Sequence, residues 1–288
     1  MIARRWWHEP AWWISTVAVI GVFLLPVIWL VLTSLKGPQD VTAYPPKILF
    51  RPTLENYNAV LSGNYMLTPG SYTPADPYFP QQLANSAIAS ATTAVVSILL
   101  GAPAAYALSR LKFRGKRDLA FFVLGSRFVP PIAIVIPVFG VYARIGLNNT
   151  LLGLIVIYIG MNVGLVTWLL KGFFDEVPRE IDEAALVDGC SRFGAFWRVT
   201  LPLTRAGLVA TGILAVLFVW NEFLFALVLT SQQTTTATVG LTTFIGGRSI
   251  AWGSLCAAGT IVTIPVFIMV LLTQRDLVRG FTGGAIHG

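Results

Sequence analysis

The residues best suited to a specific interaction lie in a polar stretch from Asp175 to Pro202, between two long apolar runs. Six of the thirteen acidic residues of the chain fall between Asp175 and Asp188. Carboxylates concentrated in this way attract a basic groove on a partner protein. The alternative is an ordinary amphipathic loop at the lipid headgroups, which we disfavour because anionic lipids repel acidic clusters. We therefore interpret the stretch as a docking surface.

The first half of this stretch predicts a short helix from about Arg179 to Asp188. Pro178 suits the first helical turn, because its ring presets φ and its missing N–H would have no helical partner there. Residues at intervals of three and four positions lie on one side of a helix. The side predicted here is flat and consists of Ile181, Ala184, Ala185 and Asp188.

The second half predicts a turn and another short helix. Gly189 can adopt a positive φ and end the first helix, and Ser191 can cap the second. Pro202 is expected to limit this second helix. The whole stretch is thus predicted to be two short helices joined by a turn.

A spaced set of residues within the stretch is specific enough to suggest a family. Glu183-Ala184-Ala185 is followed after three residues by Gly189, and after nine more by Val199-Thr200-Leu201-Pro202. Six fixed identities at these offsets recur by chance at on the order of one position in several million. The pattern resembles the EAA loop of the membrane subunits of binding-protein-dependent ABC importers, with Val199 in place of the usual Ile.

Further segments resemble the MalG-like permease subunits of carbohydrate ABC importers. They are Thr53–Tyr57, Trp220–Phe223 and the tail Arg279–Gly288. The resemblance implies an all-α, type I ABC importer permease fold. It also implies a second homologous permease subunit, two cytoplasmic ATPase subunits and an external solute-binding protein as partners. The residues that it implies for coupling to the ATPase are Glu183, Ala184, Ala185, Asp188, Gly189, Leu201 and Pro202.

Composition independently indicates a protein that crosses a membrane several times. Apolar residues make up 55% of the chain and charged residues only 11%. A soluble core cannot use so much apolar surface. The net charge of +7 would suggest nucleic acid in a soluble protein, but the basic residues here flank apolar runs, as orientation signals do. We therefore exclude nucleic-acid binding and expect membrane lipid as the surroundings.

The apolar runs predict six transmembrane helices. The first covers residues 12–35 and is followed by an external loop, 36–84, in which we assign no role to an insertion at 64–80. Residues 85–274 form the core of five further helices, with prolines breaking the third, and include the coupling loop 172–205. Residues 1–11 and 275–288 are the terminal segments.

The basic residues predict the orientation of these helices. The terminal segments, the 110–117 loop and the 171–205 region hold fourteen lysines and arginines, whereas the loops on the opposite side hold five. Cytoplasmic loops carry the excess of such residues. Both termini and the coupling loop are therefore predicted to be cytoplasmic, in a bacterial inner membrane.

No pattern for covalent chemistry occurs in the sequence. The chain has no Gly-x-x-x-x-Gly-Lys-Ser/Thr loop for ATP phosphates, so ATP and Mg²⁺ are expected on partner subunits. Cys190 and Cys256 match no metal or redox spacing, and His8 and His287 lie near opposite termini. We predict a transport subunit without a catalytic residue, a metal site or a cofactor of its own.

Two ionisable residues, Arg127 and Glu222, lie well inside predicted spans. Arg127 is about ten residues, or ~15 Å, beyond Arg117 and so near the middle of a ~30 Å core. Together with Asn221, these residues either line or gate a polar translocation path or make structural helix contacts. The sequence leaves both possibilities open. A direct Arg127–Glu222 ion pair is not favoured, because their estimated depths differ by about 10 Å.

Other kinds of transporter fit less well. An ion-coupled secondary transporter usually has inverted repeats and carboxylates near the midplane, and would leave the Asp175–Pro202 stretch unexplained. A polyamine or phosphate importer of the same family is the next alternative to a sugar importer. A site for polyamine cations should hold more buried carboxylates than Glu222 alone. The sequence does not identify which sugar is carried.

Overall fold

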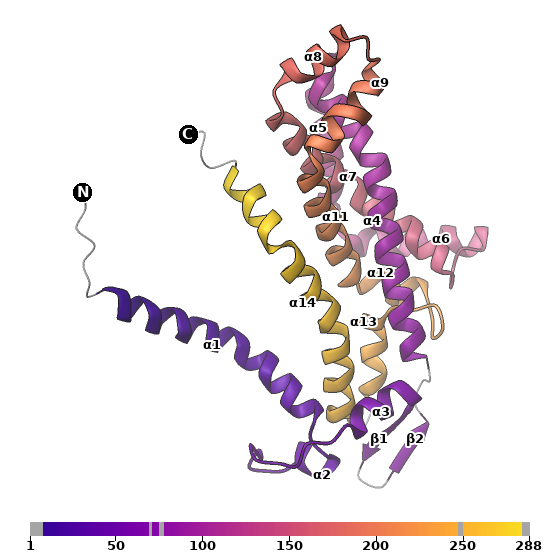
Figure 1. Ribbon diagram of the computed structural model, residues 1–288. Helices are drawn as coiled ribbons and strands as arrows, with labels where there is room; N and C mark the ends of the chain where they lie inside the picture. Colours follow the sequence, from indigo (N-terminus) through magenta and orange to yellow (C-terminus); the bar gives the residue numbers. More distant parts are fainter. Residues whose placement is uncertain (1–7, 69–70, 75–77, 247–249, 284–288) are drawn as a thin grey trace. The chain divides into compact units, whose positions relative to one another are not determined.

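The computed structural model describes residues 8–68, 71–74, 78–246 and 250–283, and their side chains over 12–63, 78–246 and 250–272 (Figure 1). Parts of the predicted cytoplasmic segments, residues 1–7 and 284–288 with His287, lie outside the described residues. The chain forms two compact units. One consists of residues 1–79 and 241–263, and the other of residues 80–240 and 264–288.

The first unit contains the first long helix and the segment that follows it. Its elements are α1 (His8–Ser34), α2 (Pro38–Val41), α3 (Glu55–Ser62), β1 (Asn64–Thr68), β2 (Ser71–Pro74), η3 (Leu241–Phe244) and the beginning of α14 (Trp252–Gly283). Asn56 connects three of them. Its buried side-chain amide donates to the carbonyl oxygens of Ser34 and Lys36, at 2.9 and 2.7 Å, and Gly253 lies so close that a Cβ there would clash with it.

Two short strands lie within the segment 64–80, whereas the other named elements of the described residues are helices. β1 and β2 pair antiparallel, with Asn64 opposite Pro74 and an irregular register between Met66 and Thr68. A two-stranded ribbon of this kind has little stability of its own in water. The all-α prediction did not anticipate these strands.

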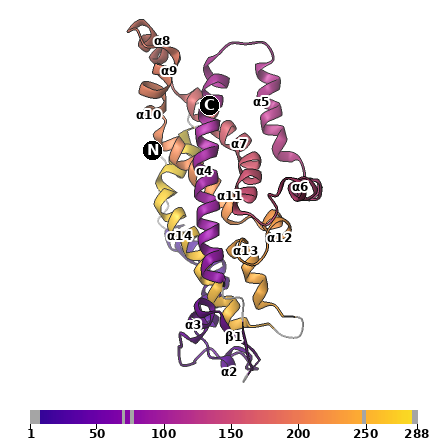
Figure 2. The same ribbon diagram turned by 90° about the vertical axis from the view of Figure 1, so that its right-hand side faces the viewer.

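The second unit is a bundle of helices, seen from two sides in Figures 1 and 2. Its elements are most of α4 (Phe79–Arg110), α5 (Lys116–Gly125), η1 (Ser126–Phe128), α6 (Pro131–Ile145), α7 (Leu151–Glu176), α8 (Arg179–Val187), α9 (Arg192–Ala195), η2 (Phe196–Thr200), α10 (Leu201–Leu203), α11 (Arg205–Trp220), α12 (Leu224–Leu229), α13 (Ala237–Gly240) and the end of α14.

Among the described residues, four helices are long and apolar enough to cross a membrane, and two bent pairs bring the number to as many as six. The four are Trp12–Ser34, Phe79–Arg110, Leu151–Glu176 and Trp252–Leu272. The predicted break in the third span is confirmed, since α5 with η1 meets α6 at 86° on either side of Val129-Pro130. The sequence predicts a fifth span over about 207–229 with an interruption at Trp220-Asn221-Glu222. The structure has two helices there, α11 and α12, separated by residues 221–223.

The helix of the second span begins at Phe79, ahead of the predicted start at residue 85. The polar residues of its first turns have partners in the loop after α12. Gln82 donates to the carbonyl of Gln232, and Asn85 donates to those of Gln233 and Thr235. Tertiary hydrogen bonds thus let polar residues form the first turns of a helix that hydropathy alone would start at residue 85.

Small side chains let α4 and α7 approach closely in the core of this unit. Ala94, Ala102 and Ala105 of α4 pack with Val166 and Leu170 of α7. Small residues at helix contacts are typical of membrane bundles, where close backbone packing replaces the hydrophobic effect as the main attraction. This core carries the polar segment at its end.

Candidate functional site

The polar stretch forms the two short helices that its sequence predicts. α8 runs from Arg179 to Val187 at the end of the second unit, after α7 (Figure 1). Pro178 differs slightly from the prediction, because it is the N-cap residue, with ψ at 138°, and precedes the first turn. Its missing N–H is harmless at either position.

The turn after α8 confirms the predicted role of glycine. Gly189 has φ at 88°, a left-handed conformation that β-branched residues avoid. The side chain of Ser191 accepts a hydrogen bond of 3.1 Å from the backbone N–H of Gly194 and so caps α9, also as predicted.

The second helical run, Arg192–Leu203, ends one residue after Pro202, close to the expected limit. After α9 the chain continues through the π-helical turn η2 and through α10, and it bends after Leu203. Pro202 lies within this run, next to the π-helical turn η2. The direction changes by 78° between this helical run and α11.

The carboxylate of Asp182, on the buried side of α8, is the centre of a hydrogen-bond network. It is 6% exposed, and its Oδ2 accepts from Arg110 Nε of α4 at 2.6 Å. Its Oδ1 accepts from the hydroxyls of Thr200, at the end of the π turn, and of Tyr106, the latter at 3.3 Å. A single carboxylate thereby joins α4, α8 and η2.

The end of α4 also forms hydrogen bonds with the segment that leads from α7 into α8. Arg110 donates from its second terminal nitrogen to the carbonyl of Val177, at 2.8 Å, in the link between α7 and α8. Ser109 donates its hydroxyl to Asp175 at 2.6 Å, and its carbonyl accepts from Arg179 at 3.4 Å. The Arg110–Asp182 ion pair is nearly buried, with side-chain exposures of 7% and 9%.

Aromatic packing surrounds the same point. The rings of Tyr106, Phe174 and Phe196 lie 5.0–6.2 Å apart in edge-on or tilted pairs. Such contacts add to the area that these side chains bury. The hydroxyl of Tyr106 therefore reaches Asp182 from a ring that is fixed by packing.

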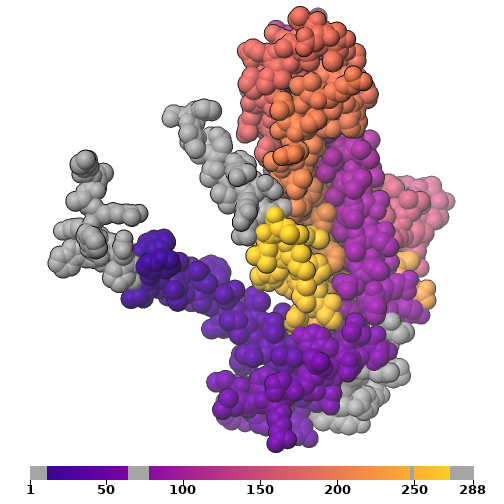
Figure 3. Space-filling model, viewed as in Figure 1, coloured from indigo at the N-terminus to yellow at the C-terminus, as the bar shows by residue number. Residues whose placement is uncertain are grey.

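The outer surface of this segment is free of these contacts. Figure 3 displays residues 179–203 as a knob at the end of the second unit. Glu183, Ala184, Asp188 and Gly189 are exposed. Of the predicted flat side of Ile181, Ala184, Ala185 and Asp188, three residues are exposed and only Ala185 is buried. The buried stripe is Asp182 with Ala185, because Arg110 and Thr200 draw Asp182 inward.

Leu201 and Pro202, the end of the predicted set, lie on the inner and outer sides of α10. Leu201 packs partly against the core around Phe174 and Phe196, whereas Pro202 is exposed. Exposed apolar side chains flank them, and Phe193 and Trp197 are 69% and 45% exposed. The knob thus presents acidic and apolar groups together.

Arg127 and Glu222 do not pair with each other in the part of the chain that the structure describes. Arg127 donates to the carbonyl of Met161 at 3.2 Å, and its guanidinium lies 4.4 Å from the ring centroid of Phe218. A cation over an aromatic ring gains electrostatic attraction without a counter-ion. Arg127 thus connects η1 to α7 and α11.

Glu222 lies in the break between α11 and α12 and caps the second of these helices. Its Oε1 accepts from the N–H of Phe225 at 3.0 Å, and its Oε2 accepts from the N–H of Ala226 at 3.3 Å and from Tyr158 Oη at 2.7 Å. Its neighbour Asn221 caps the end of α11 and donates to the carbonyl of Leu217 at 2.8 Å. All of these contacts are structural helix contacts.

Comparison with known proteins identifies the family. Residues 82–282 match the model of the binding-protein-dependent transport system inner membrane component family. The chain belongs to this family. It is therefore a permease subunit of an ABC importer, and its place is the inner membrane.

Two relatives resemble the permease over almost its full length. It is 36% identical to the trehalose transport system permease protein SugB of Mycobacterium tuberculosis over 291 residues, covering all of both chains. It is 35% identical to the trehalose/maltose transport system permease protein MalG of Thermococcus litoralis over 278 residues, covering 96% of the chain and 95% of the relative.

A solved structure supports the fold. The permease is similar, with a TM-score of 0.74 and 21% identity, to a chain of a bacterial ABC transporter involved in the import of the acidic polysaccharide alginate. The match covers 93% of this chain and 97% of the other. The predicted type I permease fold is thus confirmed.

The residues that sequence reasoning missed are those beneath α8. Asp182 directly precedes the Glu183-Ala184-Ala185 motif, and Thr200 lies within its last part, but neither was singled out. Arg110 was counted only as an orientation signal. An acidic residue three positions before buried Ala185 was a weak signal, because it places a carboxylate on the same helix stripe.

Proposed function

We propose that this permease forms half of the translocation path for a carbohydrate that a solute-binding protein delivers. The other half would be a second, homologous permease subunit, and two cytoplasmic ATPase subunits would bind ATP and Mg²⁺. The support for a carbohydrate is that two relatives of nearly full length are named for trehalose and maltose transport. Both termini, with the α8 knob, would then lie on the cytoplasmic side, as the basic residues predict.

The docking site for an ATPase subunit is the knob formed by residues 179–203. The observation that carries this proposal is the division of α8 into two sides. Asp182 and Ala185 are buried against the permease, while Glu183, Ala184 and Asp188 remain open to a partner. Interfaces gain specificity from such a mixture of charge and exposed apolar groups.

Coupling follows from how the knob is attached. A force on α8 reaches α4 through the Asp182–Arg110 ion pair and reaches η2 through Thr200. η2 continues through α10 to the bend before α11. Closure of the ATPase subunits would therefore move α4 and α11 together with α8, which opens or closes the path at their level.

Arg127, Asn221 and Glu222 have a narrower role in this proposal. Their hydrogen bonds support the break between α11 and α12 and the bend between α5 and α6. Broken helices within a membrane are tolerated where neighbours satisfy the freed backbone groups. Any effect of these residues on gating would come from fixing the geometry of the α11–α12 break and the α5–α6 bend. A polyamine importer is not favoured, because Glu222 already accepts three hydrogen bonds within the chain.

The experiment is reconstitution of the transporter, purified through a tag on this permease, into vesicles with its solute-binding protein outside and ATP inside. Uptake of trehalose, maltose, a polyamine and phosphate is measured side by side. ATP-dependent uptake of a sugar, and of neither other solute, is expected. Uptake of the polyamine or phosphate instead would refute the carbohydrate assignment and leave the docking proposal intact.

A further inference from the structure

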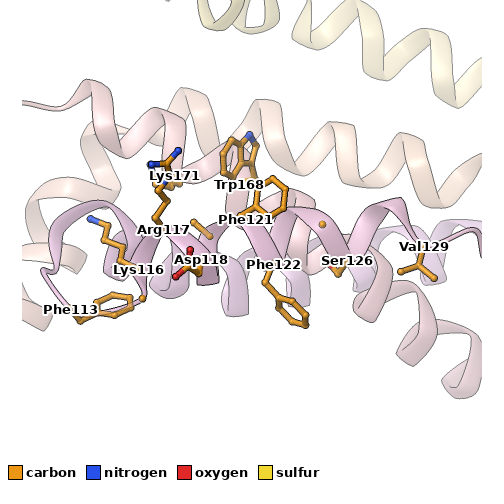
Figure 4. Close-up of a pocket in the computed structure, with 13 residues that line it drawn as sticks. Phe113, Lys116, Arg117, Asp118, Phe121, Phe122, Ser126, Val129, Trp168 and Lys171 are labelled. Carbon is orange, nitrogen blue, oxygen red and sulfur yellow. The ribbon is translucent and has the colours of Figure 1, made fainter.

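A groove of about 1580 Å³ lies along α5, on the side where this helix meets α7. It belongs entirely to the second unit and is separate from the α8 knob and from Glu222. Figure 4 shows the side chains that line it along the length of α5. No function described above uses this groove.

The chemistry of the groove changes from one end to the other. Lys116, Arg117 and Lys171 lie together at one end, near Asp118 (Figure 4). The middle is lined by Trp168 and by two phenylalanines of α5, and the far end reaches Ser126 and Val129. A molecule that fills it must therefore carry negative charge at one end and be apolar over the rest.

The cationic end of the groove carries a net positive charge. Lys171 is paired with Asp175, whereas Asp118 lines the same end and forms no salt bridge among the described residues. Lys116 donates only to the carbonyl of Ser109, at 3.1 Å, which neutralises no charge. Arg117 is exposed and has no hydrogen bond or ion pair within the described part of the chain. Lys116 and Arg117 thus have no ion-pair partner in the described chain, and the three cations with Asp118 and Asp175 leave this end a net charge of +1.

The apolar part remains open in the folded chain. Phe121 and Phe122 are each 72% exposed, and Trp168 is 41% exposed. From Lys116 to Val129 the groove spans thirteen residues, or about 20 Å along a helix. One leaflet of the hydrocarbon core is ~15 Å thick. The length therefore suits one acyl chain with its headgroup at the cationic end.

We propose that this groove binds an anionic phospholipid, with the phosphate against Lys116 and Arg117 and an acyl chain along Phe121, Phe122 and Trp168. Basic pockets between membrane helices favour such lipids over zwitterionic ones. A helix of the second permease subunit is the competing occupant. Charge favours the lipid, because a membrane helix would have to bring a buried carboxylate to meet these cations.

The first test removes the charge. The transporter is purified through a tag on this permease, exchanged into nanodiscs containing equal parts phosphatidylglycerol and phosphatidylcholine, and released for native mass spectrometry. The wild type is expected to retain one phosphatidylglycerol per permease. Lys116→Gln with Arg117→Gln should lower this retention by on the order of tenfold. Lys112→Gln with Arg114→Gln is the matched control, since these exposed residues of the same loop do not line the groove.

The second test fills the apolar part and keeps the charge. Gly125 lines the groove, has a helical φ of −61°, and offers open space to a Cβ. Gly125→Leu should therefore fold and displace the lipid. Gly140→Leu in α6 is the control, because it also meets open space but lies outside the groove.

Loss of phosphatidylglycerol in both groove variants and in neither control supports the proposal. Equal loss in the control loop variant would mean a general surface attraction and would overturn it, as would unchanged retention in the groove variants. Dissociation of the second permease subunit from the Gly125→Leu variant, with lipid retention unchanged, would assign the groove to that subunit. Unchanged sugar specificity in all variants is expected, because this proposal is independent of the substrate.

Discussion

Asp182, on the buried side of α8, and Glu222, between α11 and α12, are both carboxylates that accept three hydrogen bonds, but their donors differ. Asp182 accepts from three side chains, on Tyr106, Arg110 and Thr200, which belong to two other elements. Glu222 accepts from one side chain, Tyr158, and from two backbone N–H groups three and four residues ahead. Asp182 is also buried with a full counter-charge, whereas Glu222 is half-buried and has none among the described residues.

The two carboxylates therefore have different roles: Asp182 joins separate elements, whereas Glu222 caps the helix that follows it. A carboxylate that caps its own next helix stabilises local structure, and its loss is felt at that helix. A carboxylate shared by distant elements holds them in one arrangement, so its loss frees one element from another. The α8 knob should therefore be sensitive to single substitutions on its buried side and tolerant of those on its outer surface, except at Gly189, whose positive φ restricts the residue type.

Asp182→Ala is expected to have the largest effect. It leaves the Arg110 guanidinium buried without its counter-charge, which should destabilise the knob by about 3–5 kcal/mol. Thermal unfolding of the permease should shift down, and ATP hydrolysis should continue without sugar uptake. The double variant Arg110→Gln with Asp182→Asn should lose less than the sum of the two single variants. Simple additivity would contradict the joining role.

Gly189→Val should have the next largest effect. A β-branched residue at a φ of 88° should cost more than the roughly 1–2 kcal/mol of an ordinary left-handed residue. We expect weaker retention of the ATPase subunits in pull-down measurements, with membrane insertion intact. Gly189→Asn should be mild, because Asn tolerates this conformation. Gly172→Val, in open space without a positive φ, is the control and should retain the subunits.

Glu222→Gln should destabilise the α12 cap by about 1–3 kcal/mol, because an amide has one acceptor oxygen for three donors. Its effect should stay local, with the transporter assembled and uptake reduced. Tyr158→Phe removes one of the three donors and leaves the charge. If uptake falls in both variants, the hydrogen bonds of Glu222 explain the effect. A fall in Glu222→Gln alone, with the thermal stability of the permease unchanged, would instead indicate that the path uses the charge.

Glu183→Ala should have the smallest effect on the permease itself, within about 0.5 kcal/mol, because this exposed residue has no partner in the described chain. It should instead weaken the binding of the ATPase subunit. The loss should be ~2–5 kcal/mol if Glu183 forms a desolvated charge pair there, and far less if that pair is exposed to solvent. Binding of the ATPase subunit to nanodisc-embedded permease measures it. Wild-type attachment together with wild-type uptake would remove Glu183 from the interface.

The local structure of the knob could be predicted because local chemistry determines it. Gly189 takes the positive φ, Ser191 caps the helix that follows, and Pro130 marks the bend in the third span, each through its own backbone or side chain. The set from Glu183 to Pro202 was specific enough to indicate the family, which the comparison confirms.

The side of α8 that faces inward could not be predicted in the same way. Arg110 and Asp182 are 72 residues apart, and no periodicity relates them. The spacing of Ile181, Ala184 and Ala185 places them on one side of the helix but does not say which side is buried. Asp182 lies on the buried side because it pairs with Arg110 and accepts from the hydroxyls of Tyr106 and Thr200. In the sequence Glu222 is an isolated charge within a predicted span, whereas in the structure its carboxylate accepts hydrogen bonds from the first turn of α12. Sequence by itself determined the spans, the turn and the family, whereas the tertiary structure decided which polar groups satisfy one another, because hydrogen-bond partners depend on helix packing and not on order along the chain.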